Sequence, residues 1–523
     1  MTERDRIIIV GAGHNGLVCA AYLAKAGRDV LVLEAADRVG GAAVTREFAP
    51  GYRVSACAHL LYALDADIRR ELELESHGLR IAHSNLKTAA LEAGGEPLVL
   101  AGGRVVAGRL ALDDAARLED FHARLLRFAH VLGRQHNRRP PRIGAGGRSE
   151  ALAAATLALD IRRLGREDMR EFLRVAGINV FDVLEEAFTT PLLKGAIALD
   201  AVLGTNLGPR SNNSMLNLLH RLSGLALNGA TGPSLPQGGL GAVTAALAAA
   251  AEAKGAKLRT GAPVARITLE GDRVSGVELE GGETLPAATV ISNADPARTL
   301  LTLVGARHLE TGFVHRVRHL RSRGTAAKLH LALAGLPEFT GLAAELVGER
   351  LLIAPDPLYI ERAFDVSKYG ACSPEPAFEI TVPSVHDPSL TSSSRQHVLS
   401  AVVQYAPYDQ RASSDAARNE FLDRVLSVLE RYAPGLGRKI VASELLLPAD
   451  IEREFRITGG HWHHGEFALD QFMMLRPVPG AAQYAMPIDG LYLCGAGCHP
   501  GGGVIGSAGR NAARAVLNGE RSS

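Results

Sequence analysis

The feature that most constrains the fold of this chain is a glycine-rich run between a short apolar segment and a helical one. Residues 6–10 predict a strand, and Gly11, Gly13 and Gly16 follow it in the spacing GxGxxG. In this spacing the first glycine permits a tight turn, the second leaves room for a pyrophosphate, and the third lets the helix pack closely on the strand. The amide groups at the start of the helix would face the phosphates. This order predicts a dinucleotide-binding βαβ unit.

A carboxylate completes the unit. Residues 30–33 predict a second strand, which ends at Glu34, 18 residues after Gly16. A carboxylate in this place accepts hydrogen bonds from a ribose 2′-hydroxyl and repels a 2′-phosphate, so NADP is disfavoured here. The alternative is a glycine-rich turn without a ligand, with Glu34 as a solvated strand end. The complete order of strand, glycines, helix, strand and acid favours the ligand.

A second pair of glycines narrows the ligand to FAD. The run 38–42 follows Glu34 at once, and its Gly40 and Gly41 again suit a close approach of the backbone to a phosphate. We therefore expect this run to continue the phosphate-binding surface begun at Gly11.

The other end of the chain holds a further glycine-rich segment. The apolar run 491–493 leads into the glycines of 495–497, and three more glycines follow at 501–503. We expect their amides to lie near the pyrophosphate and the pyrimidine edge of the flavin, where they would stabilise negative charge on the reduced ring. Residues 501–506 match GxGxxG as a string, but no strand precedes them. We therefore expect no NAD(P) domain, and oxygen, a quinone or another protein as the electron acceptor.

These motifs resemble those of the two-dinucleotide-binding-domain flavoproteins, which include amine oxidases and phytoene desaturases. The segments that carry the resemblance to the phytoene-desaturase-like branch are 11–16, 40–45, 50–52, 71–80 and, most specifically, 459–513. Within this branch the chain is similar to the group named for a pyridine nucleotide-disulfide oxidoreductase domain, and to its bacterial relatives.

The resemblance implies an α/β fold of the glutathione reductase-like type, with a Rossmann-type FAD domain and an α+β substrate domain. The FAD domain is expected to be discontinuous, formed by residues 1–70, 235–300 and 456–523. The substrate domain would combine a helical part, residues 71–234, with a mixed-sheet part, residues 301–455.

The resemblance also places Val264 against the adenine and Asn293 near the dinucleotide. No histidine or cysteine lies in an attachment motif, so we expect FAD to be bound without a covalent link. The residues expected to bind it are Gly11, Gly13, His14, Asn15, Gly16, Glu34, Ala35, Arg38, Gly40, Gly41, Ala42, Val264, Asn293, Gly495, Ala496, Gly502, Gly503, Val504 and Ile505.

Catalytic residues are not identifiable from the sequence, but three histidines are candidates for lining the flavin cavity. His59, His464 and His499 lie in motifs expected near the flavin, and a hydrogen-bonded core histidine is the alternative for His464. His461 and His463 alternate along an extended segment, so few of these rings can converge on one point. We therefore expect no metal site.

The five cysteines argue against disulfide reductase activity. A disulfide reductase needs a dithiol stacked against the flavin, and only Cys57 lies in the expected region. Cys494 and Cys498 flank a glycine-rich segment and are expected to be structural thiols.

Charge and hydropathy restrict the partners. Lys and Arg total 57 and Asp and Glu 56, so the chain has no electrostatic footprint for nucleic acid.

The first predicted strand begins close to Met1, so we expect no signal peptide and a cytoplasmic protein, although animal members of the resembling branch are mitochondrial. The arginine-rich segment 133–148 predicts an exposed loop, with peripheral membrane contact as an alternative to simple solvation.

The resemblance implies hydride transfer to or from flavin N5, on an apolar, carotenoid- or lipid-like substrate. Two alternatives stay open: a redox-neutral isomerase that uses reduced FAD, and a non-catalytic regulatory flavoprotein with a protein partner. Retention of both glycine-rich segments argues against the regulatory alternative. The sequence leaves the oligomeric state and the substrate itself undetermined.

Overall fold

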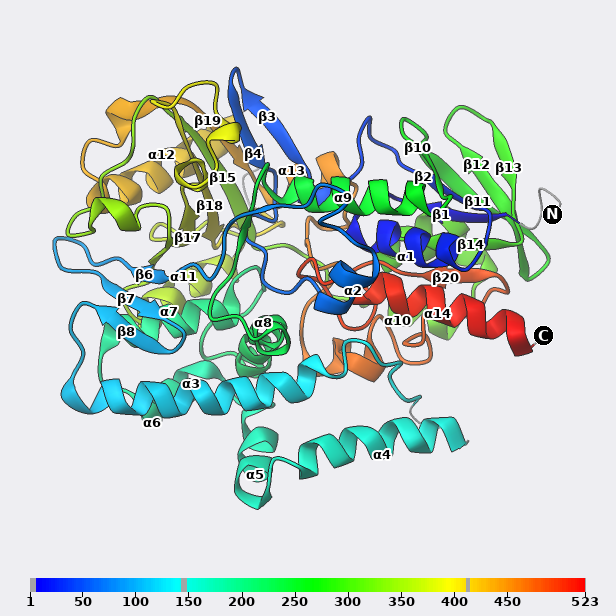
Figure 1. Ribbon diagram of the computed structural model, residues 1–523, viewed down its shortest axis with the longest axis horizontal. Coiled ribbons are helices and arrows are strands. Elements are labelled where there is room, and N and C mark those ends of the chain that lie inside the picture. The colour runs from blue at the N-terminus through cyan, green and yellow to red at the C-terminus, as the bar shows by residue number, and fades with distance from the viewer. Residues whose placement is uncertain (1–5, 143–147, 411–413, 523) are drawn as a thin grey trace.

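Two sheets lie at opposite ends of the molecule, a parallel sheet close to both chain termini and a mixed sheet at the far side (Figure 1). The computed structural model describes residues 6–142, 148–410 and 414–522.

The parallel sheet joins segments from the whole length of the chain. Its five strands run in the order β10 (Lys257–Arg259), β2 (Val30–Leu33), β1 (Ile7–Val10), β14 (Thr289–Ser292) and β20 (Leu491–Leu493). Ile7 pairs with Val30 on one side and with Thr289 on the other, and all of these pairings are parallel. The apolar β1 is buried throughout, as expected for a strand covered on both faces. The predicted βαβ unit is therefore confirmed.

Three helices cover this sheet, α1 (His14–Lys25), α9 (Leu240–Ala253) and α14 (Ser507–Ser522). Both α9 and α14 pack against α1 (Figure 1). A Cβ at Gly509 of α14 would stand 2.1 Å from the carbonyl oxygen of Asn15, so the two helices approach at backbone distance. Between β10 and β14 the chain forms an antiparallel sheet of β11 (Val264–Glu270), β12 (Arg273–Leu279) and β13 (Thr284–Pro286).

The mixed sheet has eight strands. Their order is β19 (Ile440–Leu446), β15 (Ala326–Leu333), β18 (His397–Gln404), β17 (Ala377–Thr381), β16 (Arg350–Ile353), β6 (Thr88–Ala90), β7 (Leu98–Ala101) and β8 (Arg104–Ala107). Only β16 and β6 pair in parallel. One face packs on α12 (Asp415–Tyr432), where Phe421, Val425 and Leu429 are buried.

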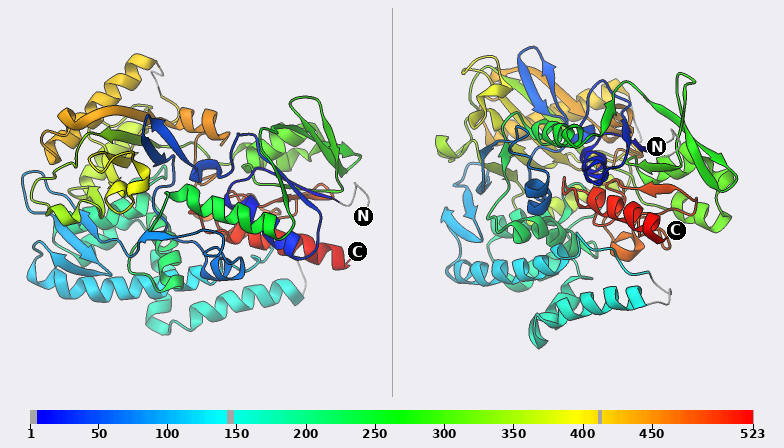
Figure 2. Two further views of the ribbon diagram at one scale, coloured as in Figure 1. Left: turned by 45° about the horizontal axis from the view of Figure 1, so that its top comes forward. Right: turned by 45° about the vertical axis from the view of Figure 1, so that its right-hand side comes forward.

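Two small strand pairs and further helices complete the described fold (Figure 2). The pairs are β3 (Thr45–Ala49) with β4 (Tyr52–Ser55), and β5 (Ile81–His83) with β9 (Leu235–Pro236). The helices are α2 (Ala66–Glu71), α3 (Leu112–Gly133), α4 (Arg148–Arg162), α5 (Arg166–Val175), α6 (Val180–Ala187), α7 (Pro191–Val202), α8 (Ser214–Asn228), α10 (Thr311–Arg318), α11 (Pro357–Ser367) and α13 (Pro448–Phe455). The β3–β4 hairpin lies against the mixed sheet, where Tyr52 and Val54 pack with Val398.

The expectation of an exposed arginine-rich loop holds for Arg139 and Arg142, which are exposed, but is wrong for other described residues of the segment. Gln135, His136 and Pro140 are buried, and Arg134 and Arg138 form ion pairs with the buried Asp160 of α4. These charges are therefore tied to a neighbouring helix. Residues 143–147 of the segment lie outside the described residues.

Within the described ranges, no helix has both the length and the apolar character needed to cross a bilayer. The boundaries that we expect for the FAD and substrate domains stay a prediction.

Candidate functional site

One cavity is lined by residues from both ends of the molecule. Gly11 and Glu34 contribute from the carboxyl ends of β1 and β2, while Glu379 and Val402 contribute from the mixed sheet. We call the part at the parallel sheet the cradle and the part at the mixed sheet the substrate end. The crevice beyond the carboxyl ends of parallel strands is the usual ligand position in such folds.

The cradle is built mainly from backbone. Gly13 caps the N-terminus of α1, whose first amides face the cavity side of β1. Glu34 accepts hydrogen bonds from the amides of Ala12, at 2.7 Å, and Ala36, at 3.0 Å. The amide of Gly40 donates to the carbonyl of Ala12 at 2.9 Å. The acidic residue and the second glycine pair are thus fixed against the first glycine turn.

Several cradle glycines have no room for a side chain. A Cβ at Gly13 would stand 2.6 Å from Asn293 Nδ2, and one at Gly502 would stand 2.3 Å from His463 Nδ1. Gly11 also has a φ of +94°, a conformation that L side chains rarely adopt. The cavity surface at these points is therefore bare backbone, which a phosphate can approach closely.

The residues present fit a bound dinucleotide, because buried polar atoms around the cavity have no protein partner. Such atoms occur on the cavity-lining residues His14, Asn15, Asn217, His220, His463 and His464. A buried polar group without a hydrogen bond costs roughly 1–3 kcal/mol, so native structures rarely leave one unpaired. A ligand rich in donors and acceptors, such as FAD, would satisfy this set.

The cavity histidines are neutral at physiological pH. Burial, followed by the nearby His464, lowers the pKa of His14 to about 4. Burial likewise lowers the pKa of His464 to about 4, although Asp295 opposes the shift. Neutral imidazoles beside the cradle can both donate and accept hydrogen bonds.

Most residues predicted from the sequence line this cavity. They are Gly11, Gly13, His14, Asn15, Glu34, Ala35, Gly40, Gly41, Ala42, His59, Val264, Asn293, His464, Ala496, Gly502, Gly503, Val504 and Ile505.

Gly16, Arg38, Gly495 and His499 do not line it. A Cβ at Gly16 would stand 2.3 Å from the carbonyl oxygen of Gly11, so this glycine serves the helix–strand packing that its spacing predicts. Gly495 likewise packs closely, with its Cβ position 2.5 Å from the carbonyl oxygen of Asn293. Arg38 is exposed and pairs with Asp37 at 2.9 Å.

The expectation that His499 lines the flavin cavity is wrong. His499 is buried, and its Nε2 lies 2.8 Å from the carbonyl oxygen of Gln135, just beyond α3. The ring is therefore held toward the helical region rather than the cavity.

A buried arginine fixes the C-terminal loops around the site. The guanidinium of Arg476 donates to the carbonyls of His463, at 2.6 Å, and Ala496, at 2.9 Å, and also to those of Gly465, Glu466 and Gln471. Burial lowers the pKa of Arg476 to about 10, so the group stays charged at neutral pH. This one cation therefore sets the position of two cavity-lining segments.

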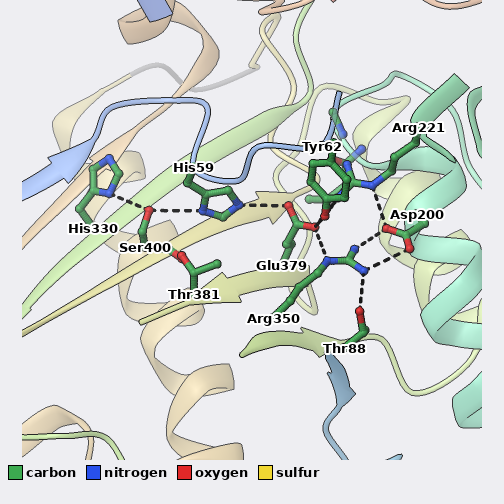
Figure 3. Close-up of polar contacts among 12 residues, drawn as sticks. His59, Tyr62, Thr88, Asp200, Arg221, His330, Arg350, Glu379, Thr381 and Ser400 are labelled. Carbon is green, nitrogen blue, oxygen red and sulfur yellow. Dashed lines mark hydrogen bonds and ion pairs between the residues drawn. The ribbon is translucent and has the colours of Figure 1, made fainter. Parts of the chain in front are cut away.

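The substrate end contains a set of charged and polar side chains that, apart from His59, the sequence predictions missed. Figure 3 shows Glu379 between His59 on one side and Tyr62, Arg221 and Arg350 on the other. We call the six residues His59, Tyr62, Asp200, Arg221, Arg350 and Glu379 the Glu379 cluster. All of them except Arg350 line the cavity.

Strand register explains why these groups meet at one face. Glu379 of β17 is paired with Val402 of β18, and Val402 is paired with Lys328 of β15, so the three side chains share a face. In the same way Ser400 stands between His330 and Thr381. Side chains alternate between the two faces of a strand. Glu379 and Val402 of this face line the cavity, and apolar residues of the opposite face, such as Leu329 and Ile380, pack with α12.

Glu379 is ionised within the cluster. Burial opposes its charge, but Arg221 and Arg350 outweigh burial and hold the pKa of Glu379 well below its usual range. His59 Nε2 donates to Glu379 Oε1 at 3.0 Å, yet burial lowers the pKa of His59 to about 4. The imidazole is thus neutral, and its other nitrogen lies 3.4 Å from Ser400 Oγ.

Two further reactive groups lie beside the cluster. Lys328 is fully buried with no hydrogen-bond partner for Nζ among the described residues, and burial lowers its pKa to about 7. Cys57 lines the cavity, and burial raises the pKa of its thiol to about 12, so the thiol is protonated and a weak nucleophile.

The five cysteines are free thiols, and Cys57 is the one that lines the cavity. Among the described residues, no group of three or more His, Cys, Asp or Glu side chains has a geometry that could hold a metal ion.

Comparison with known proteins identifies the family. The model of the flavin-containing amine oxidoreductase family matches residues 16–517. The chain is 35% identical to pyridine nucleotide-disulfide oxidoreductase domain-containing protein 2 of Rattus norvegicus, over 98% of this chain and 93% of that protein. It is 25% identical to a component of the limonene dehydrogenase of Castellaniella defragrans, over 98% and 94% of the two chains.

A solved structure shares the fold. Cyclohexylamine oxidase from Brevibacterium oxydans superimposes with a TM-score of 0.60 at 18% identity, covering 99% of this chain and 100% of the other. The fold is thus the α/β fold of FAD-dependent amine oxidases, and FAD is the cofactor for which the cradle is built. The chain belongs to the flavin-containing amine oxidoreductase family and is an FAD-dependent oxidoreductase.

Proposed function

We propose that this protein transfers hydride between a C–H bond of a substrate with an apolar body and flavin N5 of a non-covalently bound FAD. The observation that carries the proposal is the continuity of the cavity, which joins the cradle to the substrate end without an intervening wall. When bound, FAD supplies the redox chemistry, and the protein supplies binding, orientation and electrostatics.

The chain's own residues have two tasks. The backbone of Gly502 and Gly503 presents amides where the pyrimidine edge would lie. Apolar side chains line the middle of the cavity and exclude water: Leu60, Leu203, Val402, Phe455, Trp462 and Phe467. The relative from Castellaniella defragrans is named for limonene, a hydrocarbon, which also supports an apolar substrate body.

We further propose the glutathione reductase-like arrangement, with one nucleotide-binding domain interrupted by the substrate domain. The parallel sheet and the β11–β13 sheet inserted between β10 and β14 support it. Cys57 is the one cavity thiol, so we also propose that the protein is not a disulfide reductase.

The proposal is tested by anaerobic reduction of the purified flavoprotein, in which the absorbance of the flavin reports its redox state. Lipid extracts should bleach the flavin band, and oxygen or a quinone should restore it. NADH and NADPH should reduce the flavin slowly if at all. Rapid saturable reduction by NADH would overturn the proposed electron path. Conversion of a substrate with no net change of redox state would instead indicate the isomerase.

A further inference from the structure

Every carboxylate oxygen of the Glu379 cluster is already paired with a donor of the cluster itself. Oε1 of Glu379 accepts from His59, and Oε2 accepts from the hydroxyl of Tyr62 at 2.8 Å, from Arg350 Nε at 2.6 Å and from Arg221 Nη2. In Asp200, Oδ1 pairs with Arg350 and Arg221, and Oδ2 accepts from Arg350 Nη1 at 3.2 Å. Both acids are thus engaged by the cluster's own donors.

In contrast to the carboxylates, the hydrogen-bond donors of the two arginines are not all paired within the cluster. Arg350 is buried, with a side chain 3% exposed, and it donates to Glu379, Asp200 and Thr88. Arg221 of α8 lines the cavity with a side chain 19% exposed. Its Nη2 and Nε contact Tyr62, Glu379 and Asp200, whereas Nη1 contacts none of the described residues. Nη1 of Arg221 is therefore the donor that remains for a ligand in the cavity that Arg221 lines.

The net charge of the cluster and of the neighbouring Lys328 also favours an anionic ligand. The two arginines of the cluster cancel the charges of Asp200 and Glu379. Lys328, one strand beyond Val402 in the same row, adds a buried amine without a hydrogen-bond partner among the described residues, and its pKa of about 7 leaves it partly charged at neutral pH. A buried charge without a counter-charge is costly, so an anion at this end would be favoured.

We infer that the substrate carries a carboxylate on its apolar body, bound at the substrate end by Arg221. The inference rests on the proposed function, in which this same cavity holds the substrate. The same arrangement disfavours an amine at this end, because the carboxylates of the cluster are already paired with its own donors. Nη1 of an arginine carries two N–H groups and can donate charge-assisted hydrogen bonds to a carboxylate.

Three probes with the same tail test the charge preference: octanoate, octylamine and 1-octanol. Each is titrated into the FAD-containing protein at pH 7, with the flavin spectrum and the fluorescence of Trp462, the single tryptophan, as readouts. Octanoate should bind roughly ten- to a hundredfold more tightly than 1-octanol, as a charge-assisted hydrogen bond allows. Octylamine should bind no more tightly than 1-octanol. Equal binding of all three probes, or preference for octylamine, would overturn the inference.

Variants locate the binding group. Arg221→Gln should weaken octanoate about tenfold or more and leave 1-octanol within about twofold. Glu379 keeps its partners Arg350 and His59 in this variant, so FAD content should be preserved, while loss of the ion pairs to Glu379 and Asp200 should lower the melting temperature. The matched control is Arg174→Gln on α5, whose arginine forms exposed ion pairs with Glu171 and Glu186.

A second variant keeps the test decisive if Arg221→Gln does not fold. Lys328→Met removes the extra positive charge but no group that we expect to contact the ligand. It should therefore weaken the binding of octanoate but not the binding of 1-octanol. Unchanged octanoate binding in both variants would contradict the carboxylate site. Failure of the proposed function can be distinguished from failure of this inference. In that case octanoate would still bind, but no lipid extract would reduce the flavin.

Discussion

The cradle and the Glu379 cluster lie in one cavity but are built by opposite means. The cradle is bare backbone, shaped by glycines that are close together in the sequence, such as Gly11 and Gly13. The cluster consists of long charged side chains from strands and helices as distant as Tyr62 and Glu379. Substitutions that add side-chain volume should therefore affect the cradle most, and substitutions that remove a charge should affect the cluster most.

The largest effect is expected from volume added to the cradle. In Gly13→Val, the new side chain would overlap Asn293 Nδ2 and block the approach of the pyrophosphate. The purified variant should contain no flavin, as measured by its absorption at visible wavelengths. Gly177→Ala is the control, because nothing lies within 4 Å of the Cβ position at Gly177. Full flavin occupancy in Gly13→Val would show that this turn does not hold the dinucleotide.

Charge removal from the cluster should come next. Glu379→Gln leaves Arg221 and Arg350 with one carboxylate between them, and breaking a buried ion pair typically costs about 3–5 kcal/mol. Thermal or urea unfolding should show this loss, while flavin content per folded molecule stays the same because the cradle is intact. Glu375→Gln, which alters an exposed ion pair with Arg431, should change stability by less than about 1 kcal/mol. Flavin loss greater than the loss of stability would show that the two regions are not separable.

Charge removal from the cradle should have a smaller effect. Glu34→Ala removes one acidic group while the glycine turn remains, so the protein should fold. Losing charge-assisted hydrogen bonds to a ribose should weaken FAD binding by roughly 1.5–3 kcal/mol, about ten- to a hundredfold. Equilibrium dialysis after flavin removal measures this change. An unchanged dissociation constant would mean that Glu34 only holds the amides of Ala12 and Ala36.

Acid should also weaken both regions, because each contains a buried, neutral histidine. Burial lowers the folded-state pKa of His14 and His59 to about 4, below the value of about 6.5 in an unfolded chain. The unfolded chain therefore binds protons first as the pH falls. The stabilisation is complete above pH 6.5 and is lost as the pH falls through 4. The melting temperature should decrease across this window, with a shallower slope in His59→Gln, and a flat profile would contradict these burial effects.

The cradle could be predicted because its signal is local. The first and second strands end at the predicted residues, Val10 and Leu33, since glycine spacing and apolar runs determine them. The glycine loop at 501–503 was also predicted to meet the first unit, through the resemblance to a known family. His499 was misplaced because its direction depends on Gln135, which lies far away in the sequence.

The Glu379 cluster could not be assembled from the sequence, because its members come together only through the register of the mixed sheet. A signal was nevertheless present. Lys328 and His330 alternate with leucines in β15, and Glu379 and Thr381 alternate with apolar residues in β17. Polar residues at every second position of otherwise apolar strands indicate a face turned toward a polar site. Which site they face could not be deduced without the strand order.

The position of β20 at the edge of the parallel sheet has a consequence for biosynthesis. Strand β14 can pair with β1 soon after it leaves the ribosome, but its other edge must wait for β20. The 199 residues from Ser292 to Leu491 take roughly 10–40 s to translate at about 5–20 residues per second. During this interval Val290 and Ile291 border an unpaired edge, the kind of surface that recruits other strands. The nascent protein should therefore depend on chaperones until its last segment is made.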